Sequence, residues 1–224
     1  MGELPKPRVE VPERPFIHCG VDFAGPLYYK EGERRNAKRR KCYIAIFVCL
    51  ASKAVHIELS TDLSAETFLN VLRRFISRRG APTDIYSDNA TNFVGTDHDL
   101  HDLYNMFKNE RDAAEIFNYC TIEEITWHFI PPHAPHFGGI WEAAVKCAKT
   151  SLRHVAGESS LRYDELQTLL TQVEAILNSR PLSPLSEDPN DPQPLTPAHF
   201  LIGAPQGSFL ESNILYIPTH RLTR

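Results

Sequence analysis

Residues 41 to 50 read Lys-Cys-Tyr-Ile-Ala-Ile-Phe-Val-Cys-Leu, a nearly continuous apolar run that follows a charged segment. An apolar run of this length without alternation is typical of a strand buried on both faces of a sheet. Residues 16–29 form a second predicted strand. Residues 54–59 alternate apolar and polar side chains, which predicts a half-buried third strand. Because these runs are close in sequence, we expect an antiparallel meander with residues 41–50 in the middle.

The next segments alternate between helical and strand patterns. Ser64 is a predicted N-cap, and Gly80 and Pro82 are expected to end the helix that it begins. A short strand over 83–88 follows this helix, so we expect it to run parallel to an earlier strand. Further helices are predicted at 98–117, 140–155 and 164–177, and a fifth strand at 127–130. This order predicts an α/β fold with a mixed five-stranded sheet and helices on both faces.

The composition limits the class of protein. The chain has 224 residues, a net charge of −4 and no apolar run near the roughly 18 residues that span a membrane. This charge argues against a polycation that coats DNA, but it allows a local basic surface. The five cysteines are odd in number and lack Cys-x-x-Cys spacing. We therefore expect buried thiols in a reducing, intracellular compartment.

Three acidic residues stand in distinctive local settings. Asp22 lies within an apolar strand, Asp88 ends the short strand 83–88, and Glu142 opens a helix directly after a Gly-Gly-Ile-Trp sequence. A carboxylate beside an apolar strand is costly to bury unless something compensates its charge. Three converging carboxylates would hold divalent cations through oxygen ligands. A pair of such ions can clamp the attacking and leaving oxygens of a phosphodiester displacement.

Two lysines share a helix face with Glu142. Lys146 and Lys149 follow it by four and seven residues, while Val145, Ala148 and Leu152 occupy another face. A face with one carboxylate and two lysines suits a metal site beside a phosphate backbone. The alternative from the residues alone is a solvated amphipathic helix with a Glu–Lys pair.

Three blocks of the sequence resemble the signature blocks of retroviral-type integrase catalytic cores. They are Gly20-Val21-Asp22-Phe23-Ala24-Gly25-Pro26, Ser87-Asp88-Asn89-Ala90-Thr91-Asn92-Phe93 and Pro135-His136-Phe137-Gly138-Gly139-Ile140-Trp141-Glu142. The tryptophan before Glu142, together with the segment Leu195-Thr196-Pro197-Ala198-His199-Phe200-Leu201-Ile202-Gly203, is most similar to integrases of BEL/Pao-type LTR retrotransposons. The resemblance covers roughly residues 12 to 205.

This resemblance implies an RNase H-like fold and a catalytic D,D-E triad of Asp22, Asp88 and Glu142 that binds two Mg²⁺ or Mn²⁺ ions. Asp22 and Asp88 would share one ion, and Asp22 and Glu142 the other. The implied reactions are trimming of element DNA 3′ ends and their transfer into target DNA. Lys146 and Lys149 match lysines that contact element-end DNA in the family. Asn89 and His136, which lie inside the blocks, are further expected DNA contacts.

Two arginine-rich segments lie outside these blocks. Residues 34–41 are strongly basic, and we expect Arg39 and Arg40 to contact DNA phosphates, with a solvated hairpin tip as the alternative. The second segment contains Arg73, Arg74, Arg78 and Arg79, and for it a solvated helix face is favoured. The interval between Asp88 and Glu142 is longer than retroviral integrases usually show, because of an acidic region near 97–124.

The expected organisation is an extended leader over 1–15, an integrase catalytic core over 16–180 and a proline-rich extension over 181–224. The zinc module and C-terminal DNA-binding region of a full integrase are not evident, so we expect a fragment of a longer polyprotein. Expected partners are DNA and further copies of the chain, with no membrane or small-molecule substrate, in the nucleus and cytoplasm. Two alternatives stay open: an RNase H-like nuclease without transfer activity, and a non-catalytic DNA- or protein-binding module.

Overall fold

The computed structural model describes residues 6–9, 12–32, 34, 37–88, 109–130, 135–157, 160–183 and 194–206. At residues 135–137 only the backbone is described. Asn89 and the rest of the block that follows Asp88 lie outside these ranges.

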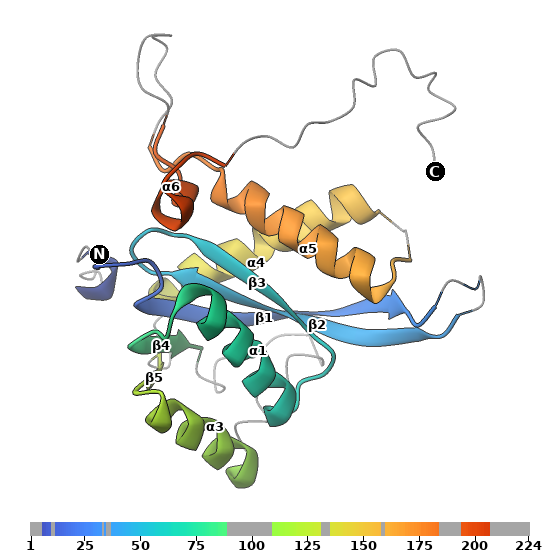
Figure 1. The fold of residues 1–224 in the computed structure, drawn as a ribbon, viewed down its shortest axis with the longest axis horizontal. Coiled ribbons are helices and arrows are strands. Elements are labelled where there is room, and N and C mark those ends of the chain that lie inside the picture. Colours follow the sequence, from blue (N-terminus) through green and yellow to red (C-terminus); the bar gives the residue numbers. More distant parts are fainter. Residues whose placement is uncertain are drawn as a thin grey trace.

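The described part of the chain forms one five-stranded sheet with the order β3-β2-β1-β4-β5 (Figure 1). The strands are β1 (His18–Lys30), β2 (Arg39–Cys49), β3 (Val55–Ser60), β4 (Asp84–Ser87) and β5 (Thr126–Phe129). The first three strands pair antiparallel, with β2 in the middle as the apolar run predicted. β4 pairs parallel to β1, and β5 parallel to β4. The predicted mixed sheet is therefore confirmed.

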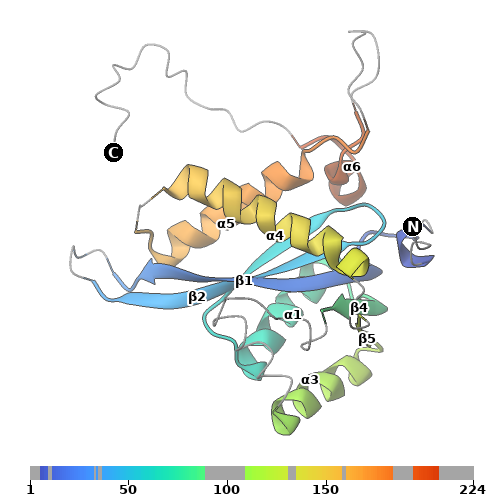
Figure 2. The same ribbon diagram turned by 180° about the vertical axis from the view of Figure 1, so that it is seen from behind.

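Helices cover both faces of the sheet. They are α1 (Ala65–Arg79), α3 (Glu110–Ile122), α4 (Pro135–Ala156), α5 (Tyr163–Asn178) and α6 (Pro197–Ile202), and a short 3₁₀ helix spans Lys6–Arg8. Figures 1 and 2 show α1 and α3 on one face and α4 and α5 on the other. None of the helices in the described ranges combines the length and apolar character needed to cross a bilayer.

Strand β2, the middle strand of the antiparallel meander, contributes to both cores. Its alternate side chains Ala45, Phe47 and Cys49 pack on the α1 side, while Ile44, Ile46 and Val48 pack on the α4 and α5 side. Because both faces are covered from Cys42 to Cys49, every side chain in that part of the strand is buried and apolar. This explains why residues 41–50 lack the alternation of a half-exposed strand.

The sequence prediction of a half-buried β3 was wrong, and the second arginine cluster has a role beyond the predicted solvated face. All six residues of β3 are buried, although the alternation predicted a half-buried strand. Glu58 is only 1% exposed because Arg74 Nε and Arg78 Nη1 donate to its carboxylate at 2.6 Å and 2.7 Å. Arg79 similarly binds the buried Glu174. Arg73, Arg74 and Arg78 are exposed, as a solvated helix face predicts, while Arg79 is half-buried. Arg74, Arg78 and Arg79 also neutralise buried acids, as charged groups inside a protein require.

Several element boundaries also differ from the predictions. α4 begins at Pro135, five residues before the expected start at 140, because proline is well accommodated in the first helical turn. α3 continues to Ile122, beyond the expected end at 117, and buries Ile116 and Cys120 against the core. Part of the acidic region near 97–124 is thus an integral element of the fold. α6 was not predicted, because the prolines around it masked a helix that starts at Pro197.

Candidate active site

The central acid of the candidate site is Asp22 on β1. It lies opposite Ile46 of β2 and so faces the side of the sheet that α4 covers. Its Oδ1 accepts a hydrogen bond from the backbone N–H of Phe23 at 2.7 Å. Burial, followed by the charge of Asp88, raises the pKa of Asp22 from 3.8 to about 7. Such a shift marks a carboxylate whose negative charge lacks adequate compensation.

Asp88 directly follows β4, the strand that runs parallel to β1. Its Oδ1 accepts a hydrogen bond from Nε1 of Trp141 at 2.9 Å. Burial raises the pKa of Asp88, although the hydrogen bond from Trp141 opposes that shift. Asp88 therefore lies at the carboxyl end of a parallel strand, the edge where ligands of α/β sheets usually bind.

The third acid, Glu142, approaches Asp88 from α4. Burial and the charge of Asp88 together raise the pKa of Glu142. A Cβ built on Gly138 would lie 2.9 Å from Oδ1 of Asp88 and 3.3 Å from Oε1 of Glu142. Both carboxylate oxygens therefore lie within 3.3 Å of one point beside the helix backbone. Asp22 lies within electrostatic range of both acids, because their charges raise its pKa.

Trp141 fixes the distance between α4 and β1. Its side chain is 1% exposed, and its six-membered ring packs directly over Gly20. A Cβ at Gly20 would come within 2.0 Å of the ring atom Cε3 of Trp141. Sequence reasoning treated this tryptophan only as a family marker and missed its role as a hydrogen-bond donor to Asp88. A glycine in an otherwise apolar strand was the available signal of a close approach.

The chemistry of these side chains fits a divalent cation. The three carboxylates offer only oxygen donors, which Mg²⁺ and Mn²⁺ prefer. Among the groups acting on Asp22, Lys149 is the one cation that lowers its pKa, and it does not offset the rise. A cation would relieve this repulsion. Within the described residues, no three His, Cys, Asp or Glu side chains are already grouped closely enough to hold a metal ion. Glu142 is exposed, so its side chain has room to move towards a bound metal ion.

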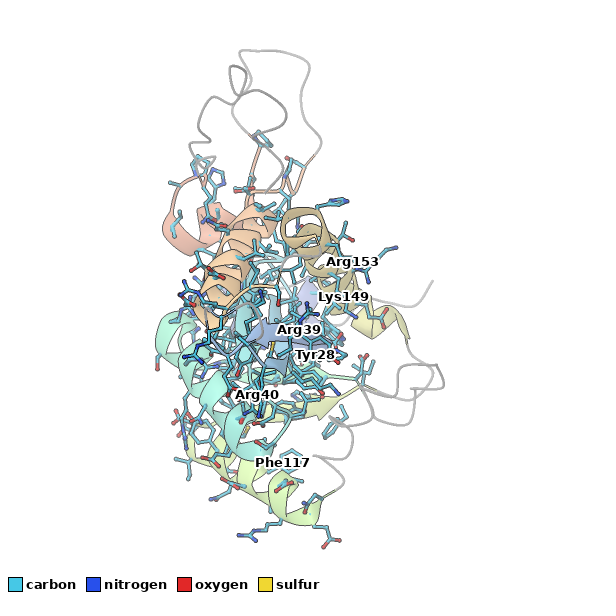
Figure 3. All side chains as sticks on the ribbon, turned by 90° about the vertical axis from the view of Figure 1, so that its right-hand side faces the viewer. Tyr28, Arg39, Arg40, Phe117, Lys149 and Arg153 are labelled. Atoms are coloured by element: carbon cyan, nitrogen blue, oxygen red, sulfur yellow. The ribbon has the colours of Figure 1, made fainter. Side chains whose placement is uncertain are left out.

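The predicted DNA-binding residues occupy two places. Lys149 lies close enough to Asp22 to affect its pKa, and Lys146 is exposed on the same helix. Arg39 and Arg40 are exposed on β2, where Arg40 Nε pairs with Oε1 of Glu31 at 3.0 Å. Figure 3 shows Lys149, from α4, near the centre of the view, with Arg39 and Arg40, from β2, below it.

The side chains of two further predicted DNA contacts, Asn89 and His136, are not described by the structure. Asn89 lies outside the described residues, and His136 is described only through its backbone, in the first turn of α4. The structure therefore brings the acidic triad and Lys149 together but assigns no position to these two side chains.

Comparison with curated proteins gives one distant relative. No family model matches the chain. An uncharacterized protein of Caenorhabditis elegans is 25% identical over 160 residues, which is 71% of this chain. The chain spans about a tenth of that protein's length.

Solved structures give clear likenesses in fold. A chain of the simian T-cell lymphotropic virus intasome, solved in complex with PP2A regulatory subunit B56 gamma, superposes with a TM-score of 0.56 at 16% identity. The match covers 95% of this chain and 63% of that one. The magnesium complex of the HTLV-2 integrase catalytic core, in a dimeric form, gives 0.52 at 16% identity over 84% of this chain and 98% of its own. The BIV integrase catalytic core gives a TM-score of 0.52 at 18% identity, over 84% of this chain and 95% of its own. The chain has the RNase H-like fold of the retroviral integrase catalytic cores.

Proposed function

We propose that this chain is the catalytic core of a retroelement integrase, a metal-dependent polynucleotidyl transferase. It would trim the 3′ ends of element DNA and join them to target DNA. The observation that carries this proposal is the convergence of Asp22, Asp88 and Glu142 at one edge of an integrase-type sheet. The magnesium in the HTLV-2 core supports the choice of cation.

Each acid has a distinct part in the proposed site. Two bound Mg²⁺ or Mn²⁺ ions would activate the attacking hydroxyl and stabilise the leaving oxygen. Asp22 would contribute to both ions, as the resemblance to integrase cores implies, and its electrostatic coupling to Asp88 and Glu142 is consistent with that role. The hydrogen bond from Trp141 holds Asp88 in one orientation. Glu142, exposed on α4, would complete the ligand set.

Basic residues near the acids would bind the DNA backbone. Lys149 and Lys146 follow Glu142 along α4 and would hold phosphates of the element end. Arg39 and Arg40, on the β1–β2 hairpin, would extend this contact, with Asn89 and His136 as further DNA ligands. The dimeric form of the HTLV-2 core supports assembly of several copies of this chain. We place this activity inside the cell, in the cytoplasm and nucleus.

A strand-transfer reaction tests the proposal. The purified chain, Mn²⁺ and a labelled DNA end that already carries the trimmed 3′ terminus should give joined products longer than the input. Glu142→Gln and Asp88→Asn should each abolish these products. Glu115→Gln changes an exposed glutamate of α3 and should leave them unchanged.

The same reaction separates the alternative functions. Shortened products without joined ones, lost in Glu142→Gln, would identify a nuclease that uses water alone. DNA binding without any product would identify a binding module. Joined products that persist in Glu142→Gln would contradict the assignment of that residue to the site.

A further inference from the structure

A cavity of about 390 Å³ lies next to the acids, between the second half of β1 and the last turns of α4. Its volume falls within the range of about 300–1,000 Å³ that is common for ligand pockets. Lys149 both lines this cavity and acts electrostatically on Asp22. The cavity and the acidic site are therefore neighbours on one side of the sheet.

The cavity has an apolar floor and a basic rim. The floor is formed by side chains from β1, β2, α4, α5 and the segment before α5: Ala24, Leu27, Ile44, Leu152, Leu161 and Leu166. At the rim, Lys149 and the exposed Arg153 lie one helical turn apart on α4, as Figure 3 shows. None of the described residues that line the cavity is acidic. No ion pair to either cation is found within the described ranges.

The strand β1 is irregular where it borders the cavity. The register with β2 shifts between Ala24 and Leu27, so Gly25 and Pro26 have no partner residue on β2. Pairing resumes at Leu27, and bulges of this kind are common next to active sites. Both residues line the cavity, so the irregular part of β1 forms part of its wall.

We propose that this cavity receives one nucleobase of the DNA strand that passes the acidic site, with its phosphate held by Lys149 and Arg153. The inference rests on the proposed function, because it takes DNA as the substrate. A nucleotide combines a flat, weakly polar base with an anionic phosphate, which matches an apolar floor beneath two cations. Arg153 lies about 16 Å along α4 from Glu142, so only a few nucleotides separate the two places.

Arg153 also has an ordinary explanation, since a basic residue in the last turn of a helix favourably meets the negative end of its dipole. That explanation accounts for one cation at the end of α4. It does not account for the apolar cavity beneath Arg153 or for the second cation, Lys149, that lines the same cavity.

The test measures binding of labelled duplexes that carry a short single-stranded tail, in EDTA so that no reaction occurs. One abasic residue is moved through the tail. With the unmodified chain, one tail position should bind roughly tenfold more weakly when its base is missing, as for loss of one base contact. Ala156→Phe, which fills the cavity, should lower affinity for the intact tail and remove the penalty at that position. Val155→Phe, at a 61% exposed neighbour, is its control.

The cations are tested with the same duplexes. Arg153→Gln should weaken binding of the intact tail, whereas Arg111→Gln, at an exposed position of α3, should not. Equal affinity for every abasic tail, or a penalty that Ala156→Phe leaves intact, would overturn the cavity assignment alone. Failure of the unmodified chain to bind any duplex would instead overturn the proposed function together with the inference.

Discussion

The indole nitrogen of Trp141 donates a hydrogen bond to Oδ1 of Asp88 at 2.9 Å, while the six-membered ring of the same side chain lies against Gly20. One residue thus sets both the spacing between α4 and β1 and the orientation of an acid of the proposed site. Because Gly20 lies two residues before Asp22, this contact also positions the strand that carries the central acid.

Trp141→Phe should separate these two roles. Phenylalanine keeps an aromatic ring against Gly20 but cannot donate to Asp88, so the pKa of Asp88 should rise further. Loss of a hydrogen bond to a charged group corresponds to about 1.5–3 kcal/mol, and Mn²⁺ affinity should fall about tenfold or more. Calorimetric titration measures this change. Trp127→Phe is the matched control, because Trp127 donates instead to the neutral Ser87 at 3.0 Å. An equal loss of affinity in both variants would contradict a specific role for Trp141.

Gly138 and Gly139 give a second matched pair. A Cβ at Gly138 would press on Asp88 and Glu142, whereas a Cβ at Gly139 would have no atom within 4 Å. Gly138→Ala should therefore reduce strand transfer at least tenfold, and Gly139→Ala should leave it unchanged. Gly139→Ala should also raise helix stability by up to about 1 kcal/mol. Reaction rates and thermal melts check both variants, and equal rates would place Gly138 away from the acids.

Asp22→Asn should stabilise the metal-free protein. The pKa of Asp22 is about 7 in the folded state, against 3.8 ordinarily, so the folded protein retains a proton that the unfolded chain loses between these values. Stability therefore falls as pH rises through that window. At pH 8 in EDTA the variant should be more stable by at most about 4 kcal/mol, at 1.36 kcal/mol per pKa unit.

Thermal melts of the Asp22→Asn variant and its parent at pH 8 and pH 4 measure this effect. The difference should disappear near pH 4, where Asp22 is protonated. Addition of Mn²⁺ should reverse the order at pH 8, because it stabilises only the parent. A variant that is less stable than its parent at pH 8 without metal would show that the charge of Asp22 is well compensated.

The buried acid Glu174 should control stability in acid. Its Oε2 accepts from the backbone N–H of Ile57 at 2.8 Å, and hydrogen bonds and charges from His56 and Arg79 hold its pKa below 4.5. A carboxylate whose pKa is lower in the folded protein than in the unfolded chain stabilises the fold at pH values above its unfolded-state pKa. This stabilisation is lost as the pH falls through the folded-state pKa. The parent should therefore lose stability below about pH 4.5.

Glu174→Gln should remove about 3 kcal/mol at pH 7, because Arg79 loses its buried partner. The variant should then lose less stability between pH 7 and pH 3 than the parent does. Chemical denaturation at several pH values measures both slopes. Glu115→Gln, on the exposed side of α3, should follow the parent, and parallel curves for all three proteins would rule out this role of Glu174.

Sequence patterns predicted the sheet well because its strands differ sharply in composition. The continuous apolar run of β2 indicated a strand covered on both faces, and the helix before β4 indicated parallel pairing. The three acids could be named because each sits at the end or in the middle of an otherwise apolar element. Glu58 and Glu174 could not be recognised as buried, because their arginine partners come from α1, 16 to 95 residues away in sequence.

Other features of the site depend on distances between elements, which the pattern of residues along the sequence does not specify. The close approach of Trp141 to Gly20 and the cavity between β1 and α4 arise only when α4 lies on the sheet. The helix α6 was hidden by its prolines, although Thr196 and Pro197 are a common start for a helix. Local sequence therefore predicted the elements and the acids, whereas the geometry that joins them required the fold.

Titration of the chain with Mn²⁺ in a calorimeter tests most directly whether Asp22, Asp88 and Glu142 form one cation site. The parent should bind Mn²⁺, and Asp22→Asn, Asp88→Asn and Glu142→Gln should each weaken or abolish that binding, whereas Glu115→Gln should bind as the parent does. A parent that binds no Mn²⁺, or three variants that bind it as well as the parent, would contradict the account.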